Sequence, residues 1–313
     1  MSDTATRTDQ GAAGRQAPQP KVAKRQGLAE NRLAQVFLAP SVAVMALVAL
    51  FPVIYAAVVS FSLYIGRTQF GVGAANYVQA FTAARSWDSV IATFVFTMAS
   101  VACEFMIGLG FALIMNQTFV GRGVTRATIL VPWVIPTVVA ATMWQYMFNV
   151  TPGTVNYFLP FVPADFNWLG QPNTPMAAII FADVWKTAPF VALLLLAGLQ
   201  TIPTEVYESS RVDGASAWQR FTQITLPLLK PAILVALLFR TTEALRVFDL
   251  PWVMTKGQFG TETLSILVNE YVVRTVNPGY ASALSTLTFG IILGVGVIFV
   301  SLLGKDLVLG TQE

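Results

Sequence analysis

Charged side chains interrupt two otherwise apolar stretches of the chain. Asp183 and Lys186 lie three residues apart in one stretch, and Arg240 and Glu243 lie three residues apart in the other. A charge at the centre of a membrane-spanning helix costs about 2.5–3.5 kcal/mol and therefore usually faces a cavity or a partner. Such groups bind hydroxyls through strong, charge-assisted hydrogen bonds. The chemistry that they suggest is reversible recognition of a polar ligand.

The composition excludes chemistry that depends on histidine. The chain has 313 residues, no histidine and a single cysteine, Cys103, which cannot form a disulfide within the chain. Without histidine there is no imidazole metal site and no Ser-His-Asp or Cys-His catalysis. Only 11% of the residues are charged, against about 25% in soluble domains, and the net charge of +3 is too small for a nucleic-acid binder. The remaining class is a membrane protein.

Helical periodicity places the charged residues on defined faces. At about 100° per residue, the polar residues of each stretch fall on a single helix face. In the first stretch that face consists of Asp183, Lys186, Thr187 and Phe190. In the second it consists of Arg240, Glu243, Ala244 and Val247. Both faces lie near mid-membrane, where transporters commonly hold their substrate. The alternative is that Asp183–Lys186 and Arg240–Glu243 are ion pairs within each helix that aid assembly.

Apolar stretches long enough to cross a membrane need about 20 residues. The sequence contains six of them, at residues 36–64, 88–116, 126–149, 175–200, 229–254 and 281–303. Pro132 and Pro136 in the third stretch and Pro189 in the fourth should kink or break their helices. In the second stretch Glu104 stands alone. We expect it to hydrogen-bond to a neighbouring helix, with gating or proton transfer as the alternative.

The distribution of lysine and arginine predicts the orientation. Residues 1–32 are polar and basic, lack the apolar run of a signal peptide, and are expected to form a disordered cytoplasmic tail. With that tail inside, the basic residues of the inner loops are Arg122, Arg126, Arg211, Arg220, Lys230 and Lys305. Those of the outer loops are Arg67, Arg85, Lys256 and Arg274. Both termini are therefore predicted to be cytoplasmic, with residues 33–313 forming one six-helix domain.

The inner loop of residues 201–228 is long, polar and helix-like. Thr204 can cap a helix there, and Glu205 suits its first turn. Gly214 is expected to end this helix in a left-handed conformation. A second short amphipathic turn follows at residues 217–221. These residues alone allow two interpretations equally well, a helix–Gly–helix docking device or an interfacial helix that lies on lipid.

This loop resembles the EAA signature of binding-protein-dependent ABC importer permeases. The matching residues are Glu208, Ser209, Ser210, Asp213, Gly214, Ala215, Ile224, Leu226 and Pro227. Ser209 and Ser210 stand where the family usually has two alanines, and their small size keeps close docking possible. The resemblance extends to residues 185–190 and 230–257 and spans most of the chain after residue 33. The overall pattern resembles the carbohydrate-uptake branch of the maltose/trehalose type.

The resemblance implies an all-α membrane protein with six transmembrane helices, the architecture of a type I ABC importer permease, and a place in the inner or plasma membrane. It implies that the loop docks into a cytosolic ATPase subunit through Glu205, Glu208, Ser209, Ser210, Asp213, Gly214 and Ala215. It places sugar contacts on Lys186, Thr187, Phe190, Arg240, Glu243, Ala244 and Val247. Arg246 and Asp249 point elsewhere on their helix and are expected to contact a partner permease.

An importer permease acts with a second homologous permease, two ATPase subunits and an extracytoplasmic sugar-binding protein, which we expect to meet the outer loop of residues 255–280. No Walker A motif, G-x-x-x-x-G-K-[ST], occurs in the sequence, which fits a chain whose ATP and Mg²⁺ are bound by its partners. We therefore predict no cofactor, no metal and no covalent catalysis in this chain. The expected cargo is a disaccharide such as trehalose or maltose.

Three alternatives remain open. An ion-coupled secondary transporter would use Glu104, Asp183 or Glu243 as a proton or sodium site, although such carriers lack an EAA-like loop. A membrane-embedded enzyme, such as a lipid-linked transferase, would need a cluster of acids and bases at a membrane surface. The third is a permease of the same family that carries glycerol phosphate or a polyol. The cationic side chains in the middle of the spans suit an anionic cargo, but the acidic side chains beside them offset their positive charge, so the sequence does not decide between these cargoes.

Overall fold

The computed structural model describes residues 35–309 apart from 67, 152, 160 and 173, with side chains up to residue 302. The predicted tail, residues 1–32, lies outside the described residues. The chain divides into two compact units, residues 1–54 and 55–313.

The described part of the first unit is one apolar helix. It belongs to a helix that runs over Gln35–Val59 and contains a π-helical turn, η1 (Ala46–Leu50), before α2 (Phe51–Val59). Its large apolar side chains are exposed along its length. A helix that is apolar all round is typical of a membrane span.

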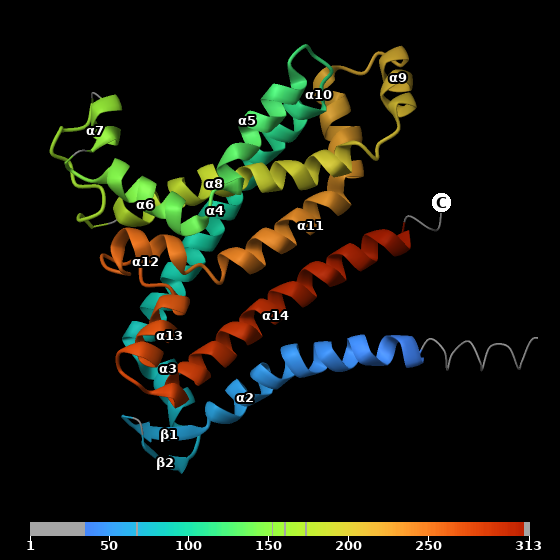
Figure 1. The fold of residues 1–313 in the computed structure, drawn as a ribbon. Helices are drawn as coiled ribbons and strands as arrows, with labels where there is room; N and C mark the ends of the chain where they lie inside the picture. The colour runs from blue at the N-terminus through green and yellow to red at the C-terminus, as the bar shows by residue number, and fades with distance from the viewer. Residues whose placement is uncertain (1–34, 67, 152, 160, 173, 310–313) are drawn as a thin grey trace, which may run out of the picture. The chain divides into compact units, whose positions relative to one another are not determined.

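The second unit consists almost wholly of helices (Figure 1). Its elements in chain order are β1 (Ser62–Ile65), β2 (Thr68–Val72), α3 (Ala75–Thr82), α4 (Ala84–Asn116), α5 (Arg122–Val134), α6 (Thr137–Phe148), α7 (Thr154–Phe158), α8 (Thr174–Leu199), α9 (Thr204–Val212), α10 (Ala217–Arg220), the π-helical η2 (Phe221–Thr225), α11 (Leu226–Ala244), α12 (Asp249–Thr255), α13 (Leu264–Val273) and α14 (Pro278–Leu309). The second, fourth and sixth predicted spans correspond to α4, α8 and α14.

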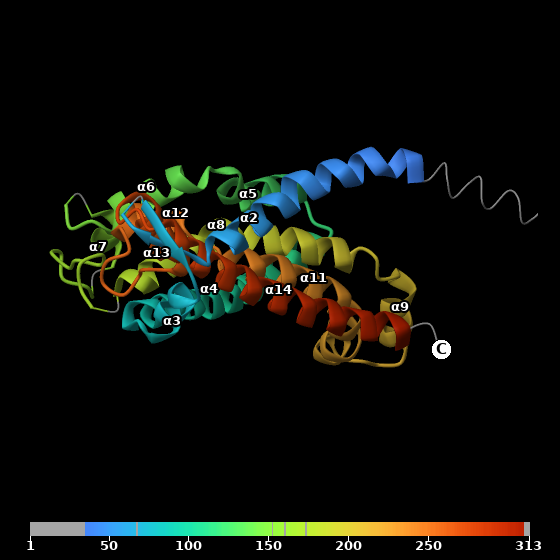
Figure 2. The ribbon, with the colours of Figure 1, turned by 90° about the horizontal axis from the view of Figure 1, so that it is seen from below.

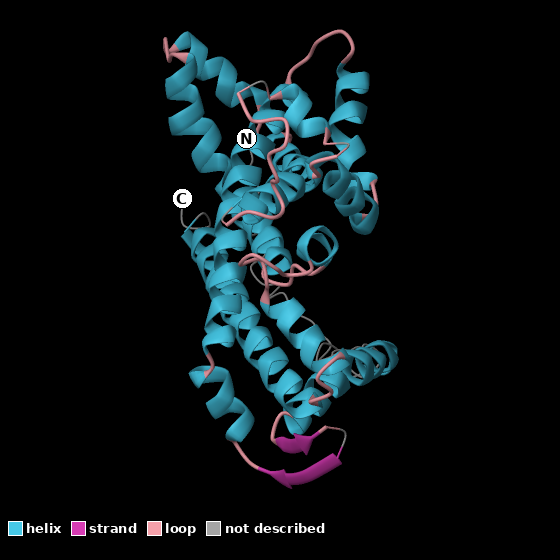
Figure 3. Ribbon diagram, turned by 90° about the vertical axis from the view of Figure 1, so that its left-hand side faces the viewer, coloured by secondary structure: helices cyan, strands magenta, loops and turns pink. Residues whose placement is uncertain are grey.

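A two-stranded antiparallel hairpin, β1–β2, follows the first helix (Figure 3). Gly66 adopts φ +60° in its turn, a left-handed conformation that glycine reaches without steric cost. The prediction of an all-α chain is therefore wrong here, and the predicted span 36–64 ends at Val59. Leu63 and Tyr64 ended that span in the sequence, and the strand continues to Ile65. Aromatic and β-branched residues such as Tyr64 and Ile65 favour strands.

The third predicted span, 126–149, is two helices rather than one. α5 and α6 are bent by 91° relative to each other. Between them Ile135 is extended, with φ −68° and ψ 130°, which is the conformation that a following proline favours, and Pro136 stands at the N-cap of α6. The expected break is confirmed at Pro136, whereas Pro132 and Pro189 remain inside α5 and α8.

The helix that corresponds to the fifth predicted span, 229–254, begins and ends earlier in the sequence than predicted. A continuous helix covers Ala217–Ala244, and it ends in tightened turns that reach Val247. Pro251, in the first turn of α12, has no N–H to donate and would clash with the carbonyl of Val247 if the helix continued. That carbonyl instead accepts a hydrogen bond from Thr263 Oγ1 at 2.9 Å.

α8 is the central helix of the second unit and packs against α4, α5 and α11 (Figure 1). Two glycines allow the close approach. A Cβ at Gly108 of α4 would lie 2.8 Å from Val191 Cγ1, and one at Gly198 of α8 would lie 2.4 Å from Ala232 Cβ. Small residues at such contacts let membrane helices pack tightly.

Two apolar clusters fill the core on either side of a polar layer. Along α4, Phe96 and Val101 belong to one cluster and Leu109 to the other, with the buried Glu104 between them. Along α8, Ala182 belongs to the first cluster and Val191 to the second, with the polar residues Asp183, Lys186 and Thr187 between them. The polar layer thus crosses three packed helices at one level.

The exposed helices α9 and α10 lie at one end of the second unit, and α12 and α13 lie at the other end (Figure 2). The polar layer lies between these two ends, on α4, α8 and α11.

Candidate functional site

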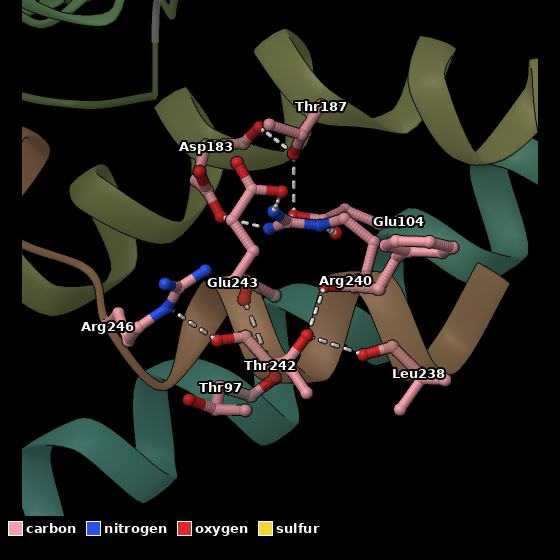
Figure 4. A network of polar contacts seen from close by, with 11 residues as sticks. Thr97, Glu104, Asp183, Thr187, Leu238, Arg240, Thr242, Glu243 and Arg246 are labelled. Atoms are coloured by element: carbon pink, nitrogen blue, oxygen red, sulfur yellow. Dashed lines mark hydrogen bonds and ion pairs between the residues drawn. The ribbon is translucent and has the colours of Figure 1, made fainter. Parts of the chain in front are cut away.

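A guanidinium group bound by three carboxylates forms the centre of the polar layer (Figure 4). Arg240 of α11 donates from Nε and from Nη2 to Glu104 of α4, with Nη2 at 2.7 Å from Oε1. Nη2 also donates to Asp183 Oδ2 of α8 at 3.0 Å. Nη1 donates to Glu243 Oε2 at 2.9 Å. The side chains of Arg240 and Glu104 are 2% and 0% exposed, so this network ties three helices together inside the core.

Two further residues of α8 extend the network in different ways. Thr187 donates from Oγ1 to Glu104 Oε1 at 2.7 Å. Lys186 is only 8% exposed, yet no hydrogen bond or ion pair joins its ammonium group to another described residue. The hypothetical Asp183–Lys186 pair is therefore not formed, because Asp183 pairs with Arg240, whereas the Arg240–Glu243 pair is formed.

A cavity of about 160 Å³ opens beside this network. Six of the seven residues predicted to contact sugar line it, namely Lys186, Thr187, Arg240, Glu243, Ala244 and Val247. Asp183 lines it as well. Among the charged groups bonded to Arg240, Glu243 is the accessible one, with 61% of its side chain exposed. The cavity therefore offers a free cation, an accessible carboxylate and apolar wall atoms to a polar ligand.

Phe190, the seventh predicted contact, does not line this cavity. Its ring stacks on Trp133 of α5, with centroids 5.7 Å apart and planes 17° apart. A half-buried aromatic ring at the cavity is that of Phe248, which stacks on Trp252 at 5.7 Å and 15°. Phe248 lies beyond the end of α11, so helical periodicity did not predict its direction.

Arg246 and Asp249 were predicted to point away from the site, and this prediction is wrong in its geometry. Both line the cavity and both are exposed. Both follow Ala244, where α11 ends, so the helical periodicity of α11 does not determine their direction. Arg246 Nε is held by a hydrogen bond to the carbonyl of Thr242 at 3.2 Å.

Glu104 is the residue of this site that sequence reasoning left isolated. The expected hydrogen bond to a neighbouring helix is confirmed, but its partners, Arg240 and Thr187, were not foreseen. A buried carboxylate requires a cation at a matching depth, and that rule points to Lys186 or Arg240. Within the described residues no group of three or more histidine, cysteine or acidic side chains is placed to hold a metal ion.

The exposed loop at the other candidate site begins with α9, which ends in a Schellman motif. Gly214 adopts φ +77°. Its N–H donates to the carbonyl of Arg211 at 3.1 Å, and the N–H of Ala215 donates to the carbonyl of Ser210 at 2.9 Å. The predicted left-handed end at Gly214 is confirmed.

The second helix of the loop starts with a capping box. Ser216 Oγ accepts from the N–H of Gln219 at 3.2 Å, and Gln219 Oε1 accepts from the N–H of Ser216 at 2.8 Å. α10 confirms the predicted turn at 217–221 and continues without a break through η2 into α11. The predicted cap of the first helix is wrong, because Pro203 holds the N-cap position and Thr204 is already the first helical residue.

The loop presents a mixed polar and apolar surface. The exposed members of the predicted coupling set are Glu205, Glu208, Ser209, Asp213 and Gly214. Ser210 is buried and donates to the carbonyl of Tyr207 at 2.8 Å, and Ala215 is half-buried. Beside them Val212 and Trp218 are 88% and 71% exposed. Large apolar side chains exposed among charges are typical of a surface that binds a partner or a lipid.

Comparisons with known proteins cover most of the chain. A family model described as "Binding-protein-dependent transport system inner membrane component" matches residues 104–307. The chain is 46% identical, over 73% of its length and 78% of the relative, to "Trehalose/maltose transport system permease protein MalF" of Thermococcus litoralis. It is 40% identical, over 88% of its length and 90% of the relative, to "Trehalose transport system permease protein SugA" of Mycobacterium tuberculosis.

The fold also matches a solved structure, that of "a bacterial ABC transporter involved in the import of the acidic polysaccharide alginate". The TM-score is 0.78 at 22% identity, and the match covers 90% of this chain and 98% of the other. At this identity the likeness establishes the fold, and it confirms the permease fold that the EAA-like loop implied.

Proposed function

Because the chain belongs to the family of binding-protein-dependent transport system inner membrane components, we propose that it is the permease subunit of an ATP-driven importer of a neutral disaccharide. The observation that carries this proposal is the polar cavity between α8 and α11, which lies within apolar helices long enough to cross a membrane. The names of its relatives, trehalose and trehalose/maltose permeases, support a sugar as the cargo.

The charge of the cavity favours a neutral cargo. Its lining has three cationic side chains, Lys186, Arg240 and Arg246, and three acidic ones, Asp183, Glu243 and Asp249. Glu104, directly behind Arg240, adds a further carboxylate. A phosphorylated or otherwise anionic cargo would meet these carboxylates at close range, which costs several kcal/mol in poorly solvated surroundings. A sugar exchanges hydrogen bonds with both kinds of group.

Individual side chains have separate tasks in this site. Lys186 donates to sugar oxygens, and Glu243 accepts from sugar hydroxyls, both through charge-assisted hydrogen bonds. Ala244 and Val247 contact the apolar C–H face of the ring. Phe248 supplies the aromatic surface that the resemblance had placed at Phe190. Thr187, whose hydroxyl already donates to Glu104, lies at the inner wall.

The size of the cavity implies a second subunit. Its volume of about 160 Å³ is below the range of about 300–1,000 Å³ that ligand pockets usually have. A homologous permease would supply the other half of the site. Arg246 and Asp249, exposed at the cavity edge, are suited to contact that partner.

The α9–α10 loop is the coupling element of the proposed importer. Its exposed acids and the exposed side chains of Val212 and Trp218 form the surface that docks on an ATPase subunit. ATP and Mg²⁺ are bound by two such partner subunits, which hydrolyse the nucleotide. Docking on a protein is favoured over lying on lipid because the helix carries Glu205, Glu208 and Asp213 on its exposed side, and carboxylates are repelled by an anionic membrane surface.

The chain is proposed to cross the cell membrane six times with both termini in the cytoplasm. Five helices qualify as spans, and the bent α5–α6 pair provides the sixth. With α9 and α10 inside, α12 and α13 face outward (Figure 2). An extracytoplasmic binding protein would meet that end, where the exposed Arg85 donates to Glu262 Oε1 at 2.7 Å.

Transport then follows from alternating access. The loaded binding protein docks outside while ATP closes the ATPase dimer, and the coupling loop transmits that motion to the spans. Sugar enters the cavity and is released inward when ATP is hydrolysed. The helix that carries Glu243 is continuous with the second half of the loop, so loop motion reaches the site directly.

The test is ATP-dependent uptake by the reconstituted complex. The chain would be incorporated into proteoliposomes with its second permease, its ATPase subunits and its binding protein, and given labelled trehalose, maltose, glycerol 3-phosphate or a polyol. Saturable uptake of a disaccharide that requires ATP and the binding protein is expected. Preference for glycerol 3-phosphate would contradict the neutral cargo. Uptake by the chain alone in a proton or sodium gradient, without ATP, would contradict the importer itself.

A further inference from the structure

We propose that Arg240 does not touch the cargo and is instead a positioning residue, held by Glu104, that keeps Glu243 ready for it. This inference rests on the proposed function and refines the resemblance, which placed Arg240 among the sugar contacts. Its starting point is the way in which the guanidinium is already occupied in the structure (Figure 4).

The guanidinium has little left to offer a ligand. Of the five N–H groups of an arginine side chain, the ones on Nε and Nη2 are directed at Glu104 and Asp183, and one on Nη1 is directed at Glu243. The side chain is 2% exposed. A sugar hydroxyl would have to displace a carboxylate from it, exchanging a hydrogen bond between two opposite charges for one between the cation and a neutral oxygen.

The two sides of the guanidinium differ in what they contact. The Nε–Nη2 side makes a fork with the two oxygens of Glu104, whose side chain is 0% exposed and does not line the cavity. The Nη1 side meets Glu243, whose side chain is 61% exposed. Glu104 therefore fixes the orientation of Arg240, and Arg240 fixes the carboxylate that faces the cavity. A lysine could not replace it, because its ammonium lacks the planar fork.

Arg240 also bonds the acid that could pair with Lys186. Asp183 and Lys186 are three residues apart on α8, a spacing that supports an ion pair. Arg240 Nη2 donates to Asp183 Oδ2 at 3.0 Å, whereas Lys186 makes no hydrogen bond or ion pair with another described residue and interacts with Asp183 only electrostatically. The carboxylate of Asp183 is therefore bonded to Arg240 rather than to Lys186.

The experiment uses the complete reconstituted importer and measures KM and maximal rate for disaccharide uptake. Glu104→Gln removes a charge that lies outside the cavity and holds Arg240 in place. Glu243→Gln removes the accessible carboxylate at the cavity. The variant with both substitutions completes a double-mutant cycle, which measures whether the two effects on KM are independent. Asp88→Asn is the matched control, because Asp88 is an exposed carboxylate of the same helix α4, away from the cavity.

Glu104→Gln is expected to raise KM at least tenfold with a smaller change in maximal rate, while Asp88→Asn leaves both unchanged. The double variant should have a KM close to that of Glu243→Gln alone, because Glu104 acts through Glu243. Arg240→Lys should behave like Glu104→Gln. Should Glu104→Gln not assemble, Glu104→Asp, which keeps the charge but withdraws it by one methylene, takes its place in the cycle.

Two results would overturn the positioning role. One is an unchanged KM in assembled Glu104→Gln or Glu104→Asp complexes. The other is full additivity with Glu243→Gln together with near-normal affinity in Arg240→Lys, which would indicate direct contact between the cation and the sugar. If the wild-type complex takes up no disaccharide at all, the proposed function fails, and that outcome is distinct from both.

Discussion

The polar layer and the coupling loop carry similar side chains but obtain their structure in opposite ways. In the layer, Arg240 and Glu104 are 136 positions apart in sequence and are buried together only when three helices pack. In the loop, the Schellman motif at Gly214 and the capping box at Ser216 are made by residues within a few positions of each other. The layer depends on tertiary packing, and the loop depends on local backbone chemistry.

This difference separates two kinds of mutational damage. A change that separates the packed helices of the layer leaves its buried charges without partners, which is strongly destabilising in a core, so the protein itself should be lost, whereas a change of similar shape such as Glu104→Gln keeps the helices packed. A change in the loop leaves the apolar clusters intact and should remove only the connection to the ATPase. The following substitutions test that separation, beginning with the largest expected effect.

Gly198→Val should abolish the folded protein. A Cβ at this position would lie 2.4 Å from Ala232 Cβ, so α8 and α11 cannot keep their contact and the polar layer loses its alignment. Overpacking usually costs about 1–3 kcal/mol and sometimes more. The amount of detergent-stable complex after size-exclusion chromatography should fall at least tenfold.

Gly110→Val is the matched control for that substitution. Gly110 also lies in a spanning helix, α4, but nothing lies within 4 Å of its added Cβ. Its complex should be recovered in nearly normal amounts. Equal losses for both variants would show that valine in a span, rather than the α8–α11 contact, causes the damage.

Gly214→Val should uncouple the transporter without unfolding it. Nothing lies within 4 Å of a Cβ at Gly214, yet its φ of +77° is left-handed, which costs a side-chain-bearing residue roughly 1–2 kcal/mol. Sugar uptake and sugar-stimulated ATPase activity should fall at least tenfold at a normal level of complex in the membrane. Gly214→Asn should retain much more activity, because asparagine tolerates this conformation. A loss of the complex itself would break the proposed distinction between loop and layer.

Phe248→Leu should weaken cargo binding moderately. The substitution keeps an apolar side chain but removes the aromatic face, whose interactions are worth about 0.5–1.5 kcal/mol, so KM should rise roughly two- to tenfold. Phe190→Leu is the control, since Phe190 stacks on Trp133 outside the cavity, and its KM should stay near that of the wild type. The reverse order of the two KM values would restore the assignment that the family resemblance implied.

Ser216→Ala should have the smallest effect. It removes the Oγ acceptor of the capping box, which is worth about 1 kcal/mol to the start of a helix. Sugar-stimulated ATPase activity should fall a few-fold, and the yield of complex should not change. Ser301→Ala, which removes a hydroxyl bonded to the carbonyl of Ile298 within α14, should leave ATPase stimulation as it was.

The sequence predicted what local chemistry determines. The end of α9 at Gly214 and the break at Pro136 follow from the preferences of glycine and of the residue before proline, and both are present. Six of the residues predicted to contact sugar line one cavity, two from α8 and four from α11 and the turns that follow it, and their contact with a sugar stays a prediction. Local patterns did not predict where α11 ends, because Pro251 acts by a clash four residues earlier in the chain, and so Phe248 was missed.

The pairing of charges between helices was beyond sequence reasoning for a different reason. Asp183 and Glu243 each had a candidate cation three residues away, whereas Glu104 had none, and of the two candidate pairs only Arg240–Glu243 is formed. Only the packing of α4 against α8 and α11 brings Glu104 to Arg240 and takes Asp183 from Lys186. The hairpin β1–β2 was missed because the short run of apolar residues in β1 continues the apolar pattern of the preceding span.

The helix over Ala217–Ala244 joins the two candidate sites in one element. At about 1.5 Å per residue it is roughly 40 Å long, with Trp218 near one end and Glu243 near the other. The π-helical turn η2 and Pro227 lie between these ends, and helices commonly bend at such features. In the proposed importer a displacement of the loop reaches Glu243 only through this segment, so the stiffness of the segment determines how tightly cargo release follows the nucleotide cycle.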